Sequence, residues 1–161
     1  MAKSSSIETV IIKSEVTLTS GTQMGFLNVS LVNGANNGWD VLSVHMMVDS
    51  DISANTDASV GAVVRRTTST PANDIEDAVS QDVIALATVM SSAQTASSSS
   101  GPLGGDMHVM ADNVVLTNLQ FIVATIDGET VTGDVVVYFV VELMPVDVSQ
   151  SRLVGILTER P

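Results

Sequence analysis

Apolar and polar side chains alternate along most of this chain, in short runs separated by turn residues. Leu27 and Val29, for example, are separated by the polar Asn28. An alternation with a period of two residues is typical of β-strands with one face in a core. The runs that follow it predict strands at Thr9–Thr19, Gly25–Val32, Trp39–Asp49, Val60–Thr68, Asp82–Met90, Met107–Met110, Leu119–Ile126 and Gly133–Met144.

Two of these runs depart from a simple alternation. The first slips once near Ser14, which predicts a β-bulge there. The last is apolar on both faces over Val135–Leu143 and ends at Pro145. A strand that is apolar on both faces is either central in its sheet or part of an interface.

Turns and short helical segments separate the strands. Ser20-Gly21-Thr22 reads as a turn, and Asp127-Gly128-Glu129 reads as a turn of the Asp-Gly hairpin type. Thr70–Val79 begins with a capping threonine and a proline, which predicts one or two helical turns. After Ser149, the segment Gln150–Thr158 predicts a short C-terminal helix.

Strands outnumber helices, and the two do not alternate as they would in a doubly wound sheet. We therefore expect an all-β fold: a single jelly roll, or two-sheet antiparallel β-sandwich, of about eight strands with a short C-terminal helix. The 161 residues suggest one domain. Residues 1–8 are expected to form a flexible N-terminal arm, and residues 9–161 the sandwich, with a long Ser/Gly loop at 91–105.

Composition narrows the classes of function. Eighteen acidic residues against six basic ones give a net charge of −12, which argues against direct binding of nucleic acid. The chain has no cysteine, so neither disulfides nor thiolate metal sites are expected. No segment has the pattern of a signal peptide or a transmembrane span, so we expect synthesis in the cytoplasm without secretion by a signal peptide.

The strongest candidate for chemistry is an acidic loop after the third predicted strand. Asp49, Asp51 and Asp57 lie there among serine and asparagine residues, and oxygen-rich loops of this kind can bind calcium. The spacing does not match an EF-hand, so the alternative is a solvated acidic loop. Calcium at contacts between subunits would bridge carboxylates that otherwise repel one another.

Other residues carry weaker signals. His45 and His108 lie in separate predicted strands, where packing is the more common role for a lone histidine than metal binding. The pair Arg65-Arg66 favours a salt bridge, within the chain or across subunits. Trp39 is a core anchor or, alternatively, a sugar-stacking residue. The sequence has no Gly-x-Ser-x-Gly elbow and no phosphate-binding loop, so we do not expect an enzyme.

The pattern as a whole resembles a family. The short polar arm, the valine-rich strands from Ile7 to Val148, and the Ser/Gly loop are similar to small single jelly-roll viral capsid proteins. With only Lys3 and Lys13 in or beside its arm, the chain looks more like the coat proteins of icosahedral viruses with an internal membrane. That resemblance implies a capsid subunit in the virion, made in the host cytoplasm, which assembles with copies of itself and often beside a second capsid protein.

Two alternatives remain open from the sequence. A decoration or cement protein of a virion would have a similar size and a similar pattern of strands and loops. A carbohydrate-binding or adhesion module would also be a β-sandwich, although this chain has few aromatic residues for a sugar-binding face.

Overall fold

The computed structural model describes residues 8–31, 37–49, 58–66, 82–90, 103–126 and 128–149. These residues form ten β-strands and no helix. The strands are β1 (Val10–Leu18), β2 (Met24–Ser30), β3 (Asn37–Asp49), β4 (Val60–Arg65), β5 (Val83–Met90), β6 (Leu103–Asp106), β7 (His108–Val109), β8 (Val114–Val115), β9 (Asn118–Thr125) and β10 (Val135–Asp147).

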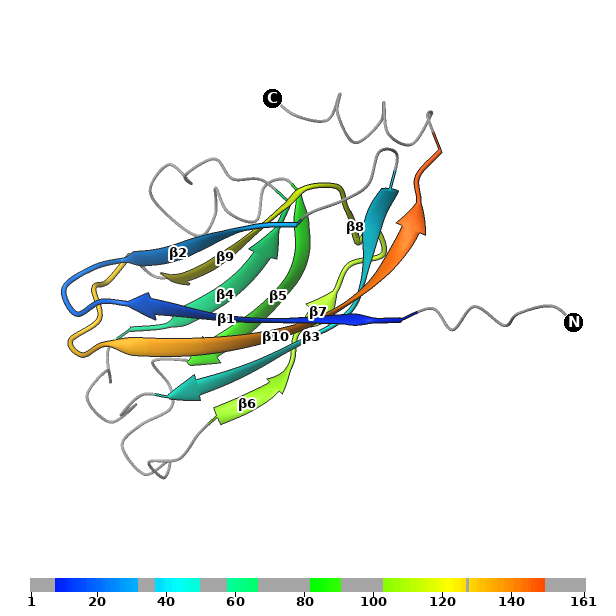
Figure 1. Cartoon of the computed structure of the whole chain (residues 1–161). Helices are drawn as coiled ribbons and strands as arrows, with labels where there is room; N and C mark the ends of the chain where they lie inside the picture. Colours follow the sequence, from blue (N-terminus) through cyan, green and yellow to red (C-terminus); the bar gives the residue numbers. More distant parts are fainter. Residues whose placement is uncertain are drawn as a thin grey trace, which may run out of the picture.

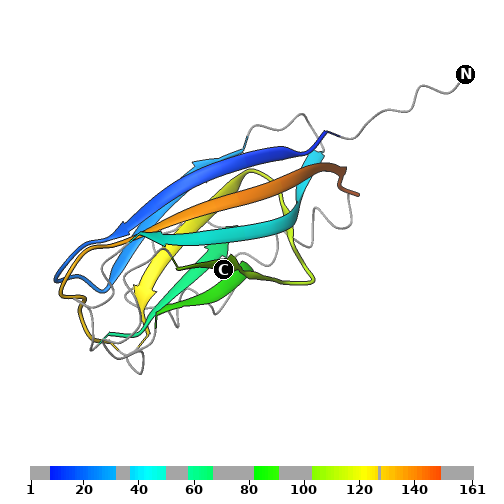
Figure 2. The same cartoon turned by 90° about the horizontal axis from the view of Figure 1, so that it is seen from below.

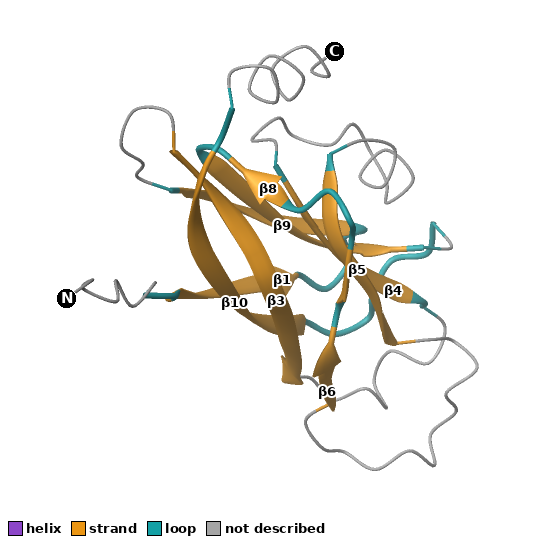
Figure 3. Cartoon of the chain, turned by 90° about the vertical axis from the view of Figure 1, so that its right-hand side faces the viewer, coloured by secondary structure: helices purple, strands orange, loops and turns teal. Residues whose placement is uncertain are grey.

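The strands form two antiparallel sheets, which pack face to face (Figure 1, Figure 3). Sheet A has the order β1-β10-β3-β6, and β8 also pairs with β3. Sheet B has the order β2-β9-β4-β5-β7. At one side of the sandwich β1 and β2 are the outermost strands, and β1 lies at the margin of sheet A beside β10 (Figure 2).

This strand order is that of a jelly roll. In the eight longest strands, β1, β10, β3 and β6 form one sheet and β2, β9, β4 and β5 form the other. Successive strands among these eight cross from one sheet to the other except β4 and β5, which are neighbours in sheet B, and this is the pattern of two Greek keys. The prediction of an all-β jelly-roll sandwich is confirmed. The predicted C-terminal helix and the helical turns at Thr70–Val79 lie outside the described residues.

The core lies between the two sheets and is mainly aliphatic, in keeping with the low aromatic content of the chain. Its one aromatic contact joins Phe121 of β9 to Phe139 of β10, with ring centroids 5.1 Å apart. Every second residue of β10 from Val135 to Leu143 is fully buried. The strand lies between β1 and β3, which confirms its predicted central position.

The predicted bulge at Ser14 is wrong. β1 pairs with β10 in a continuous register from Val10 to Leu18, and Ser14 simply occupies an inward position. The apparent slip arises because Ser14 is a polar residue at a half-buried inward position, in the same set as Ile12 and Val16. The register shift in this sheet instead lies between Glu142 and Leu143, where β10 meets β3.

The predicted end of the last strand and the predicted hairpin turn before it are also wrong. β10 continues past Pro145 to Asp147; beyond Leu143 it pairs only with β3, so a missing N–H on its other edge is tolerated. The Asp-Gly turn around Gly128 is not a hairpin turn, because β9 and β10 belong to different sheets. Gly128 has a φ of 77°.

The region after the Ser/Gly loop differs as well. Leu103–Asp106 forms β6 on the edge of sheet A, so the last residues of the predicted loop 91–105 are strand. The predicted strand Met107–Met110 reduces to His108–Val109, which pairs with β5 in sheet B. Met107 lies between the two strands with its side chain buried in the core. The chain thus crosses from sheet A to sheet B within four residues of Asp106 and partly closes that side of the sandwich.

The described residues contain no helix long and apolar enough to cross a membrane.

Candidate functional site

The structure places one of the three predicted calcium ligands. Asp49 is the last residue of β3, is exposed, and pairs in register with Val136 of β10. Asp51 and Asp57 lie outside the described residues, so the calcium site stays a prediction. Elsewhere in the described ranges, no three His, Cys, Asp or Glu side chains gather closely enough to hold a metal ion.

The two histidines occupy different sheets. His45 points outward from β3 and contacts the carboxylate of Asp106 on the neighbouring β6. Both of these side chains are largely exposed, so their interaction is a surface pair. His108 lies in β7 and pairs in register with Leu86 of β5. The structure does not bring the two histidines together.

The adjacent residues Arg65 and Arg66 are both buried and are held by contacts within the chain. Arg65 donates from Nε to Oε1 of Gln120 (2.7 Å), and Gln120 donates from Nε2 to Oδ1 of Asn28 (2.8 Å), which forms a polar chain across three strands of sheet B. Arg66 donates from Nη2 to the main-chain oxygen of Asp112 (2.7 Å) and lies 3.1 Å from its Oδ2. The predicted salt bridge is therefore intramolecular at Arg66.

Trp39 lies near the start of β3, half-buried against the core. This position agrees with its predicted role as a core anchor.

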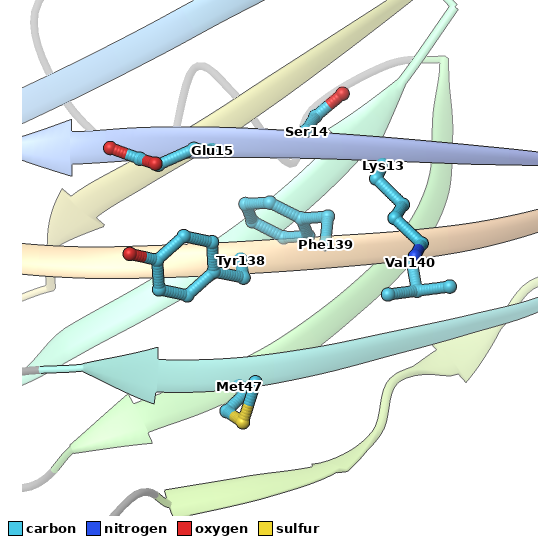
Figure 4. Close-up of a pocket in the computed structure, with 7 residues that line it drawn as sticks. All are labelled: Lys13, Ser14, Glu15, Met47, Tyr138, Phe139 and Val140. Atoms are coloured by element: carbon cyan, nitrogen blue, oxygen red, sulfur yellow. The ribbon is translucent and has the colours of Figure 1, made fainter.

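The outer face of sheet A carries an open trough of about 400 Å³. Figure 4 shows its walls: Lys13 and Glu15 come from β1, Tyr138 and Val140 from β10, and Met47 from β3. The pairing registers explain the arrangement. They place Glu15, Tyr138 and Met47 side by side in one row across the sheet.

A second row lies next to the first on this face. Lys13, Val140 and His45 are register partners across β1, β10 and β3. The side chains of Lys13 and Glu15 point in different directions from β1, with that of Lys13 reaching toward Val140 (Figure 4). The trough therefore has an apolar centre with one cation and one carboxylate at its β1 margin, while Glu142, Asp49 and the His45–Asp106 pair lie on the same face outside it.

Large apolar side chains on this face are exposed to solvent. Ile11 is 60% exposed, Met47 is 50% exposed, and Leu42, beside the register shift between β3 and β10, is 41% exposed. Exposed apolar patches on soluble proteins commonly mark binding sites. The arrangement offers contact area with few polar groups, which suits binding to another protein surface better than it suits catalysis.

Sequence reasoning found part of this surface. The two-faced apolar pattern of β10 predicted either a central strand or an interface, and Tyr138 and Val140 are two of the outward residues of that pattern. It did not single out Met47 or Ile11. Both look like ordinary strand residues until the pairing register shows which face they share.

No protein-family model and no curated protein sequence matches the chain. A comparison with solved structures found chains of plant viruses. A chain of Desmodium yellow mottle tymovirus is 12% identical, with 89% of this chain and 91% of that chain covered and a TM-score of 0.36. A chain of the empty head of turnip yellow mosaic virus is 11% identical, with 94% and 88% covered and a TM-score of 0.38. A further chain of turnip yellow mosaic virus is 12% identical, with 89% and 86% covered and a TM-score of 0.36.

Proposed function

We propose that this protein is a structural virion protein: a capsid subunit that associates with copies of itself to form an icosahedral shell. The observation that carries the proposal is the apolar outer face of sheet A on a jelly roll. Jelly rolls serve as viral capsid and lectin domains. A fold alone does not define a function, so the proposal rests on what this face can bind.

The exposed apolar residues supply the attraction between subunits. Ile11, Leu42 and Met47 present apolar area to solvent, and contact with another subunit would remove this area from water. Burial of such area contributes about 25 cal/mol per Å². The trough beside Tyr138 gives this face a shape that a protruding side chain can fill.

The net charge of −12 opposes association and makes it dependent on ions. Charges farther apart than about 10 Å are largely screened at 0.1 M salt. Calcium bound by Asp49, Asp51 and Asp57 would neutralise carboxylates at subunit contacts. We therefore propose that assembly strengthens with salt or calcium.

The same reasoning sets the expected partners and location. The protein would act in the virion, after synthesis in the host cytoplasm, beside copies of itself and beside a second capsid protein. Direct contact with the genome is not proposed, because eighteen acidic residues stand against six basic ones, and Arg65 and Arg66 of these six are buried in contacts within the chain.

A decoration or cement protein is the nearest alternative, with the same face bound to a different capsid protein. A carbohydrate-binding module is the more distant one. Trp39, the only tryptophan in the chain, packs against the core rather than standing on the outer face of sheet A, which disfavours a sugar-stacking role.

Negative-stain microscopy of the purified chain, alone and co-expressed with candidate coat proteins, separates these functions. A capsid subunit gives shells or regular capsomers. A decoration protein stays small alone and appears only on particles made by another protein. Glycan-array binding by a monomer, without particles under either condition, would contradict the proposal in favour of the carbohydrate-binding module.

A further inference from the structure

β1 has a free edge. In sheet A it pairs with β10 on one side, and no described strand pairs with its other side. An unpaired strand edge presents main-chain N–H and C=O groups that can bind another strand. Val10 and Ile11 at the start of β1 are 41% and 60% exposed. The edge is therefore open to a partner at this end.

The opposite end of β1 is covered, and this fixes which residues are available. Gly25 of β2 packs against the main-chain carbonyl of Thr17. That carbonyl therefore points away from β10, and so do the main-chain groups of every second residue before it. Lys13 and Glu15 belong to this set. The usable edge runs from Val10 to Val16.

The side chains along this edge are complementary to themselves. The sequence of β1 is Val-Ile-Ile-Lys-Ser-Glu-Val-Thr-Leu. If two copies run antiparallel with Ser14 opposite Ser14, Lys13 faces Glu15 of the second copy, and Glu15 faces Lys13 of the second copy. Ile12 likewise faces Val16, so apolar side chains also meet on the inner face. Each of these pairs occurs twice, as two-fold symmetry requires.

Other registers are less favourable. The main-chain groups that point outward belong to every second residue, so the register can shift only in steps of two. One such shift places Lys13 opposite Lys13, and the other places Glu15 opposite Glu15. Like charges directly opposite each other destabilise a strand pair. The charges therefore favour the register centred on Ser14 over its neighbours.

Charge also identifies this edge as a place where a second copy can approach. Of the three basic residues in the described ranges, Arg65 and Arg66 are buried and Lys13 alone is exposed. A strongly acidic protein carries few places where another copy can approach without repulsion. The edge around Lys13 is such a place, and it brings its own matching carboxylate in Glu15.

We propose that β1 is a two-fold contact at which two copies of this chain pair edge to edge about Ser14, joining their A sheets into one continuous sheet. This pairing adds a specific contact to the proposed function. It rests on that function only in requiring, as a capsid does, that copies of the chain associate. Two main-chain hydrogen bonds would form at each Lys13–Glu15 pair, and β2 would end the ladder at Thr17.

Charge exchange tests the register directly. Sedimentation velocity would compare the wild-type chain with Lys13→Glu, with Glu15→Lys, and with the double exchange. Each single variant turns two attractive pairs into repulsive ones, so its dimer should be at least about tenfold weaker. The double exchange restores dimerisation. An equimolar mixture of the two single variants forms heterodimers, since each supplies the charge that the other lacks.

Controls separate this contact from other effects. Asp147→Lys makes the same charge change as Glu15→Lys at the far end of β10, and it should leave the dimer intact. Thermal unfolding of each variant checks that it folds. A monomer at every concentration, or a dimer that ignores the exchanges, would overturn the pairing.

These outcomes can be told apart from failure of the proposed function. Particles that form despite insensitivity to the exchanges would leave the capsid proposal standing without this contact. Exchange-sensitive dimers that never form larger particles would leave the contact standing without the capsid.

Discussion

Gly25 in β2 packs its backbone directly against the main-chain carbonyl of Thr17 in β1, where the two sheets meet at one side of the sandwich. A Cβ at position 25 would overlap the carbonyl oxygen and carbon of Thr17. Both neighbours are backbone, so neither can rotate out of the way. The close approach sets the spacing between the edge strands of the two sheets.

This contact predicts that Gly25→Ala destabilises the fold by about 1–3 kcal/mol, the usual range for forced overpacking. Gly105→Ala in β6 is the matched control, because nothing lies within 4 Å of a Cβ there. Its effect should stay within about 0.5 kcal/mol. Chemical denaturation of both variants measures the difference; equal stabilities would show that β1 and β2 can move apart freely.

The central position of β10 predicts that Val137→Asp abolishes soluble folding. Val137 is fully buried between the sheets, and an unpaired buried charge costs several kcal/mol, against a total stability of about 5–15 kcal/mol. Val140→Asp is the control, since this outward residue has Lys13 and His45 as register partners. Thermal unfolding of Val137→Asp that resembles the wild type would show that the assignment of β10 to the core is wrong.

The buried hydrogen bonds from Arg65 to Gln120 and from Gln120 to Asn28 in sheet B predict that Gln120→Leu lowers the free energy of unfolding. The Gln120 side chain is fully buried, accepts from Arg65 and donates to Asn28. Leucine would remove both contacts and leave a buried guanidinium group with one fewer acceptor, a loss of about 1–3 kcal/mol. Asn28→Ala removes only the outer contact and should cost less. A Gln120→Leu variant as stable as the wild type would show that the hydrogen bonds among Arg65, Gln120 and Asn28 contribute nothing to the stability of the fold.

The sequence was sufficient for the fold class because strands such as β1 keep the alternation and β10 is apolar on both faces; β4 and β9 are buried on both faces and do not alternate. It failed where tertiary pairing overrides local pattern. Pro145 does not end β10, since only one edge of the strand is paired there. The turn at Gly128 joins two sheets, a relationship that no local signal encodes.

The candidate surface was only half predictable for a related reason. Tyr138 could be assigned to an outward apolar face from β10 alone. Met47 and Glu15 reach the same row by pairing with Tyr138, from which they lie about 90 and about 120 residues away in sequence. A single sequence specifies which residues alternate within a strand but not which strands become neighbours.

The acidic loop predicts calcium binding that depends on Asp49, Asp51 and Asp57. Equilibrium dialysis with calcium should show binding by the wild-type chain and weaker binding by the triple Asp→Asn variant. Asp134→Asn, in the turn before β10 where Asp134 accepts from the main chain of Ser20, is a control for charge loss alone. Identical calcium binding by all three proteins would remove this loop from consideration.

The most direct test of the central claim is the mass distribution of the purified full-length chain in solution, measured by sedimentation velocity at increasing salt and with or without calcium. The monomer is 16.8 kDa. If copies of this jelly roll associate through sheet A and its β1 edge, the mass should shift to dimers and larger assemblies as salt or calcium rises, and return on dilution into low salt with chelator. A single 16.8 kDa species under every condition, including co-expression with a second coat protein, would contradict the account.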